Sequence, residues 1–158
     1  MNPHDLVQRA RPIGPADRIL DLGCGTGVVA RVLLGRLGAA ASITGVDVNP
    51  AMLATARADA PAIEWVEGHA AALPFTGGAF ELVLCQQLLQ FAPELPTVLR
   101  EVHRVLAPGG RLIASTSGFS GERSSSEGER LRAALTEAGF TEVLLDTTIT
   151  DVVTARRG

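Results

Sequence analysis

The chain has 158 residues, of which 46% are apolar and 20% charged, and this composition is typical of one globular domain spanning residues 1–158. A net charge of −3 argues against a nucleic-acid partner, and no apolar run reaches the roughly 18 residues of a membrane span. The two cysteines lie in apolar segments and are too few for a disulfide scaffold, so we expect a cytoplasmic protein.

Apolar spacing alternates between strand-like and helix-like segments. A short helical turn is predicted at 5–9, a strand at 18–22 and, after a glycine turn, a helix at 28–37. Further predicted elements are strands at 42–46, 63–66, 80–85 and 111–115, helices at 50–57 and 95–106, a flexible Ser/Gly-rich loop at 117–128, a helix at 129–138, and strands at 141–146 and 151–156 that can pair as a hairpin. This alternation predicts an α/β fold with a doubly wound, mostly parallel sheet, whose ligands bind beyond the carboxyl ends of the strands.

The strongest local signal is the stretch ILDLGCGTG at residues 19–27, where a buried strand enters a turn with three alternate glycines. Without side chains the turn can bend sharply and approach a ligand closely, and the helix start favours a carboxylate. Dinucleotide sites share such turns, and a tight turn without a ligand is the other interpretation. Asp47 follows the second strand about 20 residues later, where an acid accepts hydrogen bonds from a ribose, unless it is only an exposed turn residue.

Five segments, in order and with normal spacing, resemble the class I S-adenosylmethionine-dependent methyltransferases, within them the small-molecule type related to the ubiquinone and menaquinone methyltransferases. They are ILDLGCGTG at 19–27, GVDVNPAML at 45–53, EGHAAALPF at 67–75, FELVL at 80–84 and REVHRVLAPGGRL at 100–112. The resemblance covers nearly the whole chain. It implies a Rossmann-like sheet of about seven strands with the last one antiparallel, S-adenosylmethionine as the cofactor, and no metal ligands.

The resemblance also implies a role for each site residue. Asp21 would steer the ammonium of the methionine part, directly or through water, and Asp47 would bind the ribose. Gln87 would face the substrate and is the one weak candidate for catalysis. The other expected cofactor contacts are Gly23, Cys24, Gly25, Gly27 and Gln86 at the methionine part, and Val48, Met52, His69 and Ala70 at the adenine. Among these, Val48 and Met52 are open to the alternative of ordinary core residues, and the two glutamines to that of helix caps.

The chain departs from the family pattern in two places. His69 stands where relatives usually have an aspartate that accepts a hydrogen bond from the adenine amino group. A neutral histidine can still accept, whereas a protonated one cannot, and a surface-loop histidine without a contact is the alternative. Relatives also usually carry longer N-terminal helices and a longer insert after the fifth strand, so the substrate half of this chain is minimal.

These observations favour a methyltransferase that moves a methyl group from S-adenosylmethionine to a small, apolar acceptor, because positioning alone can promote such a displacement. The alternative is an S-adenosylmethionine-binding domain that is inactive alone and is completed by a protein partner or a homodimer, as the minimal substrate half suggests. A nicotinamide oxidoreductase is disfavoured, because the glycine turn lacks the GxGxxG spacing and the chain contains neither tyrosine nor lysine.

Overall fold

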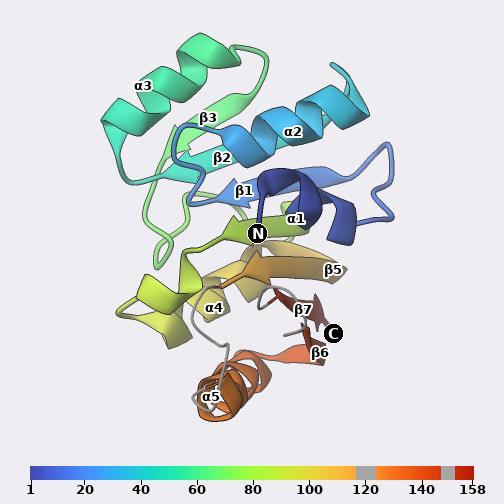
Figure 1. Cartoon of the computed structure of the whole chain (residues 1–158), viewed down its shortest axis with the longest axis vertical. Coiled ribbons are helices and arrows are strands. Elements are labelled where there is room, and N and C mark those ends of the chain that lie inside the picture. Colours follow the sequence, from blue (N-terminus) through green and yellow to red (C-terminus); the bar gives the residue numbers. More distant parts are fainter. Residues whose placement is uncertain (117–123, 147–151) are drawn as a thin grey trace.

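The computed structural model describes residues 1–116, 124–146 and 152–158, which form one sheet with helices on both faces (Figure 1). The strands are β1 (Arg18–Leu22), β2 (Ser42–Asp47), β3 (Glu64–Glu67), β4 (Phe80–Gln86), β5 (Leu106–Ser115), β6 (Phe140–Asp146) and β7 (Val152–Arg157). The helices are α1 (Pro3–Arg9), α2 (Val28–Leu37), α3 (Pro50–Asp59), the single 3₁₀ turn η1 (Leu89–Phe91), α4 (Leu95–Val105) and α5 (Ser124–Glu137).

The seven strands stand in the order β3-β2-β1-β4-β5-β7-β6. All neighbours from β3 to β5 pair in parallel, and β7 pairs antiparallel with both β5 and β6. The chain winds from β1 outward to β3 and then returns to place β4 on the other side of β1. The predicted fold class, with its antiparallel last strand, is confirmed, and the switch point lies between β1 and β4.

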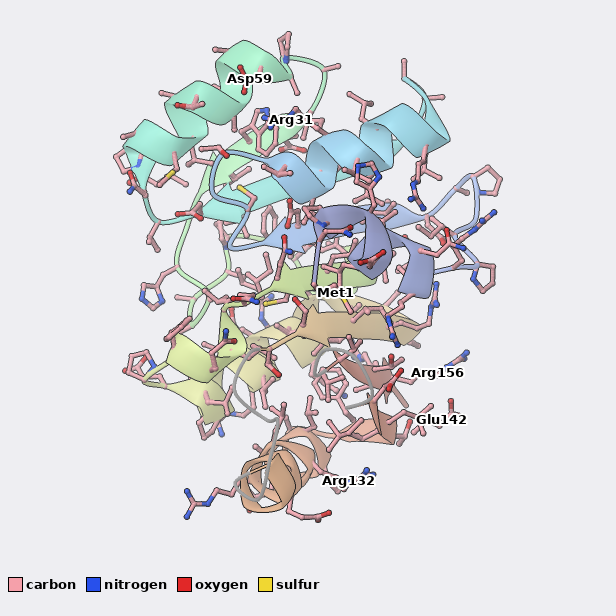
Figure 2. The ribbon with its side chains drawn as sticks, in the orientation of Figure 1. Met1, Arg31, Asp59, Arg132, Glu142 and Arg156 are labelled. Carbon is pink, nitrogen blue, oxygen red and sulfur yellow. The ribbon has the colours of Figure 1, made fainter. Side chains whose placement is uncertain are left out.

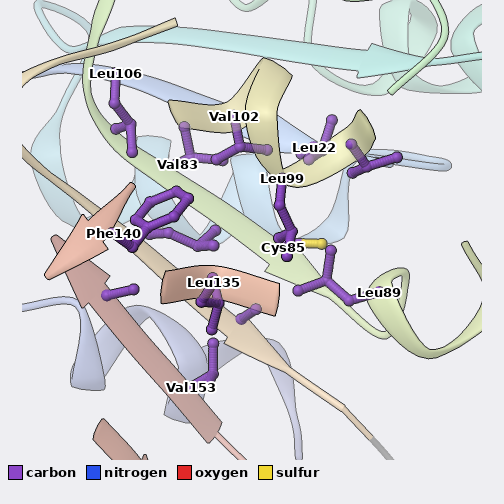
Figure 3. Packing of buried hydrophobic residues seen from close by; sticks show 14 of the residues in the cluster. Leu22, Val83, Cys85, Leu89, Leu99, Val102, Leu106, Leu135, Phe140 and Val153 are labelled. Carbon is purple, nitrogen blue, oxygen red and sulfur yellow. The ribbon is translucent and has the colours of Figure 1, made fainter. Parts of the chain in front are cut away.

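Side chains that alternate along the strands divide the apolar core into two layers. On β4, Leu82 and Leu84 belong to the layer covered by α1, α2 and α3, whereas Val83 and Cys85 belong to the layer covered by α4 and α5. Figure 3 shows the second layer, in which Leu99 and other α4 side chains pack on the sheet. Because both faces are covered, the central strands β1 and β4 are mostly apolar and buried along their length.

Local signals in the sequence fix the ends of the helices. The Asn49 side chain caps α3 by accepting hydrogen bonds from the backbone N–H groups of Ala51 and Met52, with Pro50 at the first helical position. Gly38 ends α2 with a φ of 85°, a conformation that costs glycine little.

Several predicted elements differ from the structure, among them the strand predicted at 111–115, which begins at Leu106. The N-terminal turn is a seven-residue helix, because Asn2 caps it by accepting from the Asp5 N–H at 3.0 Å and its buried Leu6 and Val7 pack against the core. Helix α5 begins at Ser124, so the predicted loop at 117–128 is wrong for its last five residues. The rest of that loop, 117–123, lies outside the described residues.

The helices that the structure describes include none with both the length and the apolar character to cross a lipid bilayer.

Candidate cofactor-binding site

The glycine turn joins β1 to α2 at the carboxyl edge of the sheet. Its first two backbone N–H groups, from Gly23 and Cys24, both donate to the Val46 carbonyl at the end of β2, at 2.9 and 3.0 Å. Gly23, Gly25 and Gly27 all have positive φ values, of 69°, 53° and 82°. Side chains would strain the backbone at these three positions, so glycine is required for the shape of the turn itself.

Packing beneath the turn adds a second requirement for glycine. Trp65 on β3 lies under the turn, and its indole N–H donates to the Ala60 carbonyl at 2.9 Å. A Cβ atom at Gly27 or at Gly45 would overlap the Trp65 ring. Sequence reasoning assigned Gly27 to ligand approach, and the structure adds that its missing side chain makes room for an aromatic ring.

Asp47, at the end of β2, connects the glycine turn to the start of α3. Its Oδ2 accepts from the Gly25 N–H at 2.8 Å, and its Oδ1 accepts from the Asn49 N–H at 2.9 Å. A carboxylate has about four acceptor positions, so one on each oxygen remains for a ligand. The residue is only half buried, which leaves those positions within reach.

Asp21, the second expected acid, is buried under the same turn. It is 2% exposed, and its Oδ2 accepts from the Ala30 N–H of α2 at 3.1 Å. Burial raises the pKa of Asp21 from 3.8 to about 7, the Ala30 N–H lowers it in part, and the charge of Asp47 raises it further. Near neutral pH the Asp21 carboxyl group is therefore only partly ionised, and a cation bound nearby would favour the ionised form.

A hollow opens between the glycine turn, the end of β2 and the loop that follows β3, and we call it the β1–β2 hollow. Val48 and Met52 are 56% and 42% exposed, so they are not core residues. Exposed apolar side chains beside a carboxylate suit a ligand with a flat apolar ring and a sugar. The residues that line the hollow are Leu22, Gly23, Val46, Asp47, Val48, Gly68, Ala70 and Leu88.

Helix α4 holds the loop that forms the far wall of this hollow. Arg104 donates to the carbonyls of Phe75 and Leu73, at 2.7 and 3.0 Å, and Glu101 accepts from the Leu73 N–H at 2.7 Å. The two side chains also pair with each other, which lowers the pKa of Glu101. Sequence reasoning missed both residues, although two opposite charges spaced three residues apart on a predicted helix were a usable signal.

His69 stabilises the same loop from within. The side chain is exposed, and its Nδ1 accepts from the Ala71 N–H at 3.1 Å, in the manner of an aspartate that closes a turn two residues ahead. A neutral imidazole has one acceptor and one donor, so the other nitrogen of His69 is left as a donor. This geometry does not supply the acceptor that we expected for the adenine amino group.

The turn after β4 brings Gln86, Gln87 and Leu88 to the same edge. Gln86 donates from Nε2 to the Met1 carbonyl at 3.0 Å and does not cap a helix. Gln87 is exposed and has a φ of 54°, an unusual value for a residue with a side chain, and its N–H donates to the Ser115 carbonyl at 2.8 Å. Leu88, which sequence reasoning missed, lies against Gly23, where a Cβ atom would be 3.2 Å from its Cδ1.

Neither cysteine offers a reactive thiolate near this edge. Burial raises the pKa of both Cys24 and Cys85 to about 12, and both are free thiols. Within the described ranges, no group of three or more His, Cys, Asp or Glu side chains is arranged to hold a metal ion. The chemistry of the site therefore rests on the two aspartates, the glycine backbone and neutral side chains.

The profile of the methyltransferase domain family matches residues 19–110, which contain the glycine turn, Asp47, the loop after β3 and helix α4. This chain belongs to that family. The match covers more than half of the chain and confirms the resemblance to the class I S-adenosylmethionine-dependent methyltransferases of small-molecule type.

Two curated relatives extend the match. The malonyl-[acyl-carrier protein] O-methyltransferase of Halorhodospira halophila is 42% identical over 117 residues, which cover 72% of this chain and 39% of the relative. The 2-phytyl-1,4-naphtoquinone methyltransferase of Thermosynechococcus vestitus is 39% identical over 109 residues, which cover 67% of this chain and 48% of the relative. The chain thus spans less than half the length of these two relatives.

Solved structures share the fold at lower identity. An S-adenosylmethionine-dependent methyltransferase from Mesorhizobium loti superposes with a TM-score of 0.79 at 23% identity, covering 97% of this chain and 96% of that one. At this identity the likeness supports the architecture alone.

Proposed function

We propose that this chain binds S-adenosylmethionine in the β1–β2 hollow as a single domain of residues 1–158 and transfers its methyl group to a small, apolar acceptor. The observation that carries the proposal is Asp47, held between the Gly25 and Asn49 N–H groups with one acceptor position left on each oxygen. That arrangement suits the two neighbouring hydroxyls of a ribose.

Other residues fit the remaining parts of the cofactor. Val48 and Met52 offer exposed apolar surface to the adenine, and Ala70 offers the backbone of the opposite wall. Asp21 lies under the glycine turn, where it would meet the ammonium of the methionine part, directly or through water. In this assignment His69 shapes the loop and does not accept from the adenine.

The bound cofactor would supply an electrophilic methyl group on a sulfonium. The protein residues would contribute alignment: the glycine turn and Asp47 fix the cofactor, while Gln87 and Leu88 stand at the edge that an acceptor must approach. Proximity and orientation of this kind account for much of the acceleration of a two-reactant step. No strong acid or base is required by the proposal.

The apolar character of the acceptor is supported by the surface beside the site. Phe91 in η1 is 73% exposed, close in sequence to Leu88. An exposed aromatic ring this close in sequence to Leu88 suits an apolar acceptor, a protein partner or a second copy that completes the substrate site. Two buried free thiols support a cytoplasmic location.

Calorimetry tests the proposal. S-adenosylhomocysteine should bind, and NAD(H) should bind much more weakly. Tighter binding of NAD(H) would contradict the assignment. Denaturing the purified protein and analysing the released small molecules by mass spectrometry is an independent check on the cofactor.

A further inference from the structure

Ser115 ends β5 at the carboxyl edge of the sheet and is fully buried, and its hydroxyl oxygen has no hydrogen-bond partner within the described part of the chain. Buried hydroxyl groups in folded proteins nearly always have a partner, because losing water without replacement costs free energy. This orphaned hydroxyl therefore needs an explanation.

Gln86 is the neighbour of Ser115 on the adjacent strand. Gln86 and Ser115 are register partners on the parallel strands β4 and β5, so their side chains point to the same face. That face is the one covered by α1, because Leu84 and Ile113, two residues earlier on each strand, pack in its core. The amide of one and the hydroxyl of the other form a small polar pair on an apolar surface.

Met1 occupies the amide of Gln86 in this pair. Its carbonyl accepts the hydrogen bond from Gln86 Nε2 at 3.0 Å, and its side chain packs against the apolar layer below α1. Figure 1 shows the N-terminus in front of β4, and Figure 2 labels Met1 there. Asn2 caps α1, so Met1 precedes the hydrogen bonds of the helix. Moving Met1 therefore breaks the Gln86 bond and leaves α1 intact.

We propose that Gln86 and Ser115 form a subsite for a neutral oxygen, a hydroxyl or carbonyl, of the methyl acceptor, which reaches it by displacing Met1. The amide N–H and the hydroxyl together can donate to and accept from such an oxygen. Neither group is charged, so a neutral hydroxyl or carbonyl fits better than a phosphate. This inference rests on the proposed function, and it assigns Gln86 to the acceptor and not to the methionine part of the cofactor, as the resemblance implied.

The two methionines of the chain, Met1 and Met52, allow a direct test. With ¹³C-methyl methionine, NMR gives one signal at each site, and Met52→Leu assigns them. S-adenosylhomocysteine should shift the Met52 signal, because the proposed function assigns that side chain to the adenine. Addition of 1-naphthol to the protein saturated with S-adenosylhomocysteine should then shift the Met1 signal.

Matched ligands and variants test whether the ligand hydroxyl contributes to binding through Ser115. Naphthalene, which lacks the hydroxyl, should bind at least fivefold more weakly than 1-naphthol. Ser115→Ala should reduce that preference to less than twofold without lowering the urea midpoint, because the lost hydroxyl has no partner. Ser42→Ala, at the opposite end of a strand, should keep the preference. The affinity for S-adenosylhomocysteine should be the same in both variants.

Three results would overturn the inference: no binding of 1-naphthol, an unmoved Met1 signal when 1-naphthol binds, or an unchanged preference in Ser115→Ala. The NMR result needs no Ser115 variant, so it decides the matter even if Ser115→Ala does not fold. Failure of S-adenosylhomocysteine to bind would overturn the proposed function and this inference together. Binding with an unmoved Met1 signal would overturn the inference alone.

Discussion

Replacing Asp47 with alanine tests the cofactor assignment most directly. In the free protein, Asp47→Ala removes the acceptor of two hydrogen bonds, from the Gly25 and Asn49 N–H groups. Hydrogen bonds to a charged group contribute about 1.5–3 kcal/mol each when buried. At a half-buried residue, water can take over some of the lost hydrogen bonding, so we expect a loss of about 1–2 kcal/mol in the free energy of unfolding.

The loss in cofactor affinity should be larger than this structural effect explains. Two ribose hydroxyls lose a charged acceptor, which corresponds to about 1.5–3 kcal/mol and a roughly ten- to hundredfold higher Kd for S-adenosylhomocysteine. Calorimetry measures the affinity, and urea unfolding measures the stability of the same preparation. Measuring both separates a lost ligand contact from a disordered turn.

Asp59→Ala is the matched control. Asp59 is the last residue of α3 and pairs with Arg31 of α2 at 3.0 Å (Figure 2), and neither residue lines the β1–β2 hollow. Because this ion pair is exposed, we expect a stability change below about 1 kcal/mol and a Kd within about twofold of the original protein. A folded Asp47→Ala variant with that same unchanged Kd would refute the ribose assignment.

Three further predictions concern the surroundings of the site. Because the raised pKa of Asp21 means that the folded chain holds a proton the unfolded chain releases, the unliganded protein should lose stability as pH rises from about 4 to 7. Urea unfolding at pH 5 and 8 should show this loss, and Asp21→Asn should remove it; an equal slope in the variant would contradict it. Gly45→Ala should destabilise the fold by about 1–3 kcal/mol through overlap with Trp65. In a Trp65→Leu background the same substitution should cost less stability. If the two substitutions destabilise additively, the overlap is not the cause. Arg104→Met should weaken the binding of S-adenosylhomocysteine several-fold, because the loop carbonyls lose their hydrogen bonds. Arg100→Met, on the exposed side of α4, should leave the affinity unchanged. Equal affinities in the two variants would show that Arg104 does not position the loop for binding.

The sequence by itself determined the architecture and the position of the site. Mostly apolar strands that alternate with helices predict a sheet covered on both faces, and three alternate glycines before a helix permit the positive φ values that the turn adopts. Asn49 and Pro50 fixed the start of α3 through their own backbone chemistry. These features depend on neighbours along the chain, so they could be predicted without knowing the packing.

The tertiary structure alone decided which distant groups meet. The overlap of Trp65 with Gly27 and Gly45 depends on how β3 packs against β2 and the turn. The position of Met1 over Gln86 depends on how α1 docks across β4 and β5. Such contacts join residues up to 85 positions apart in the sequence, and no local spacing encodes them.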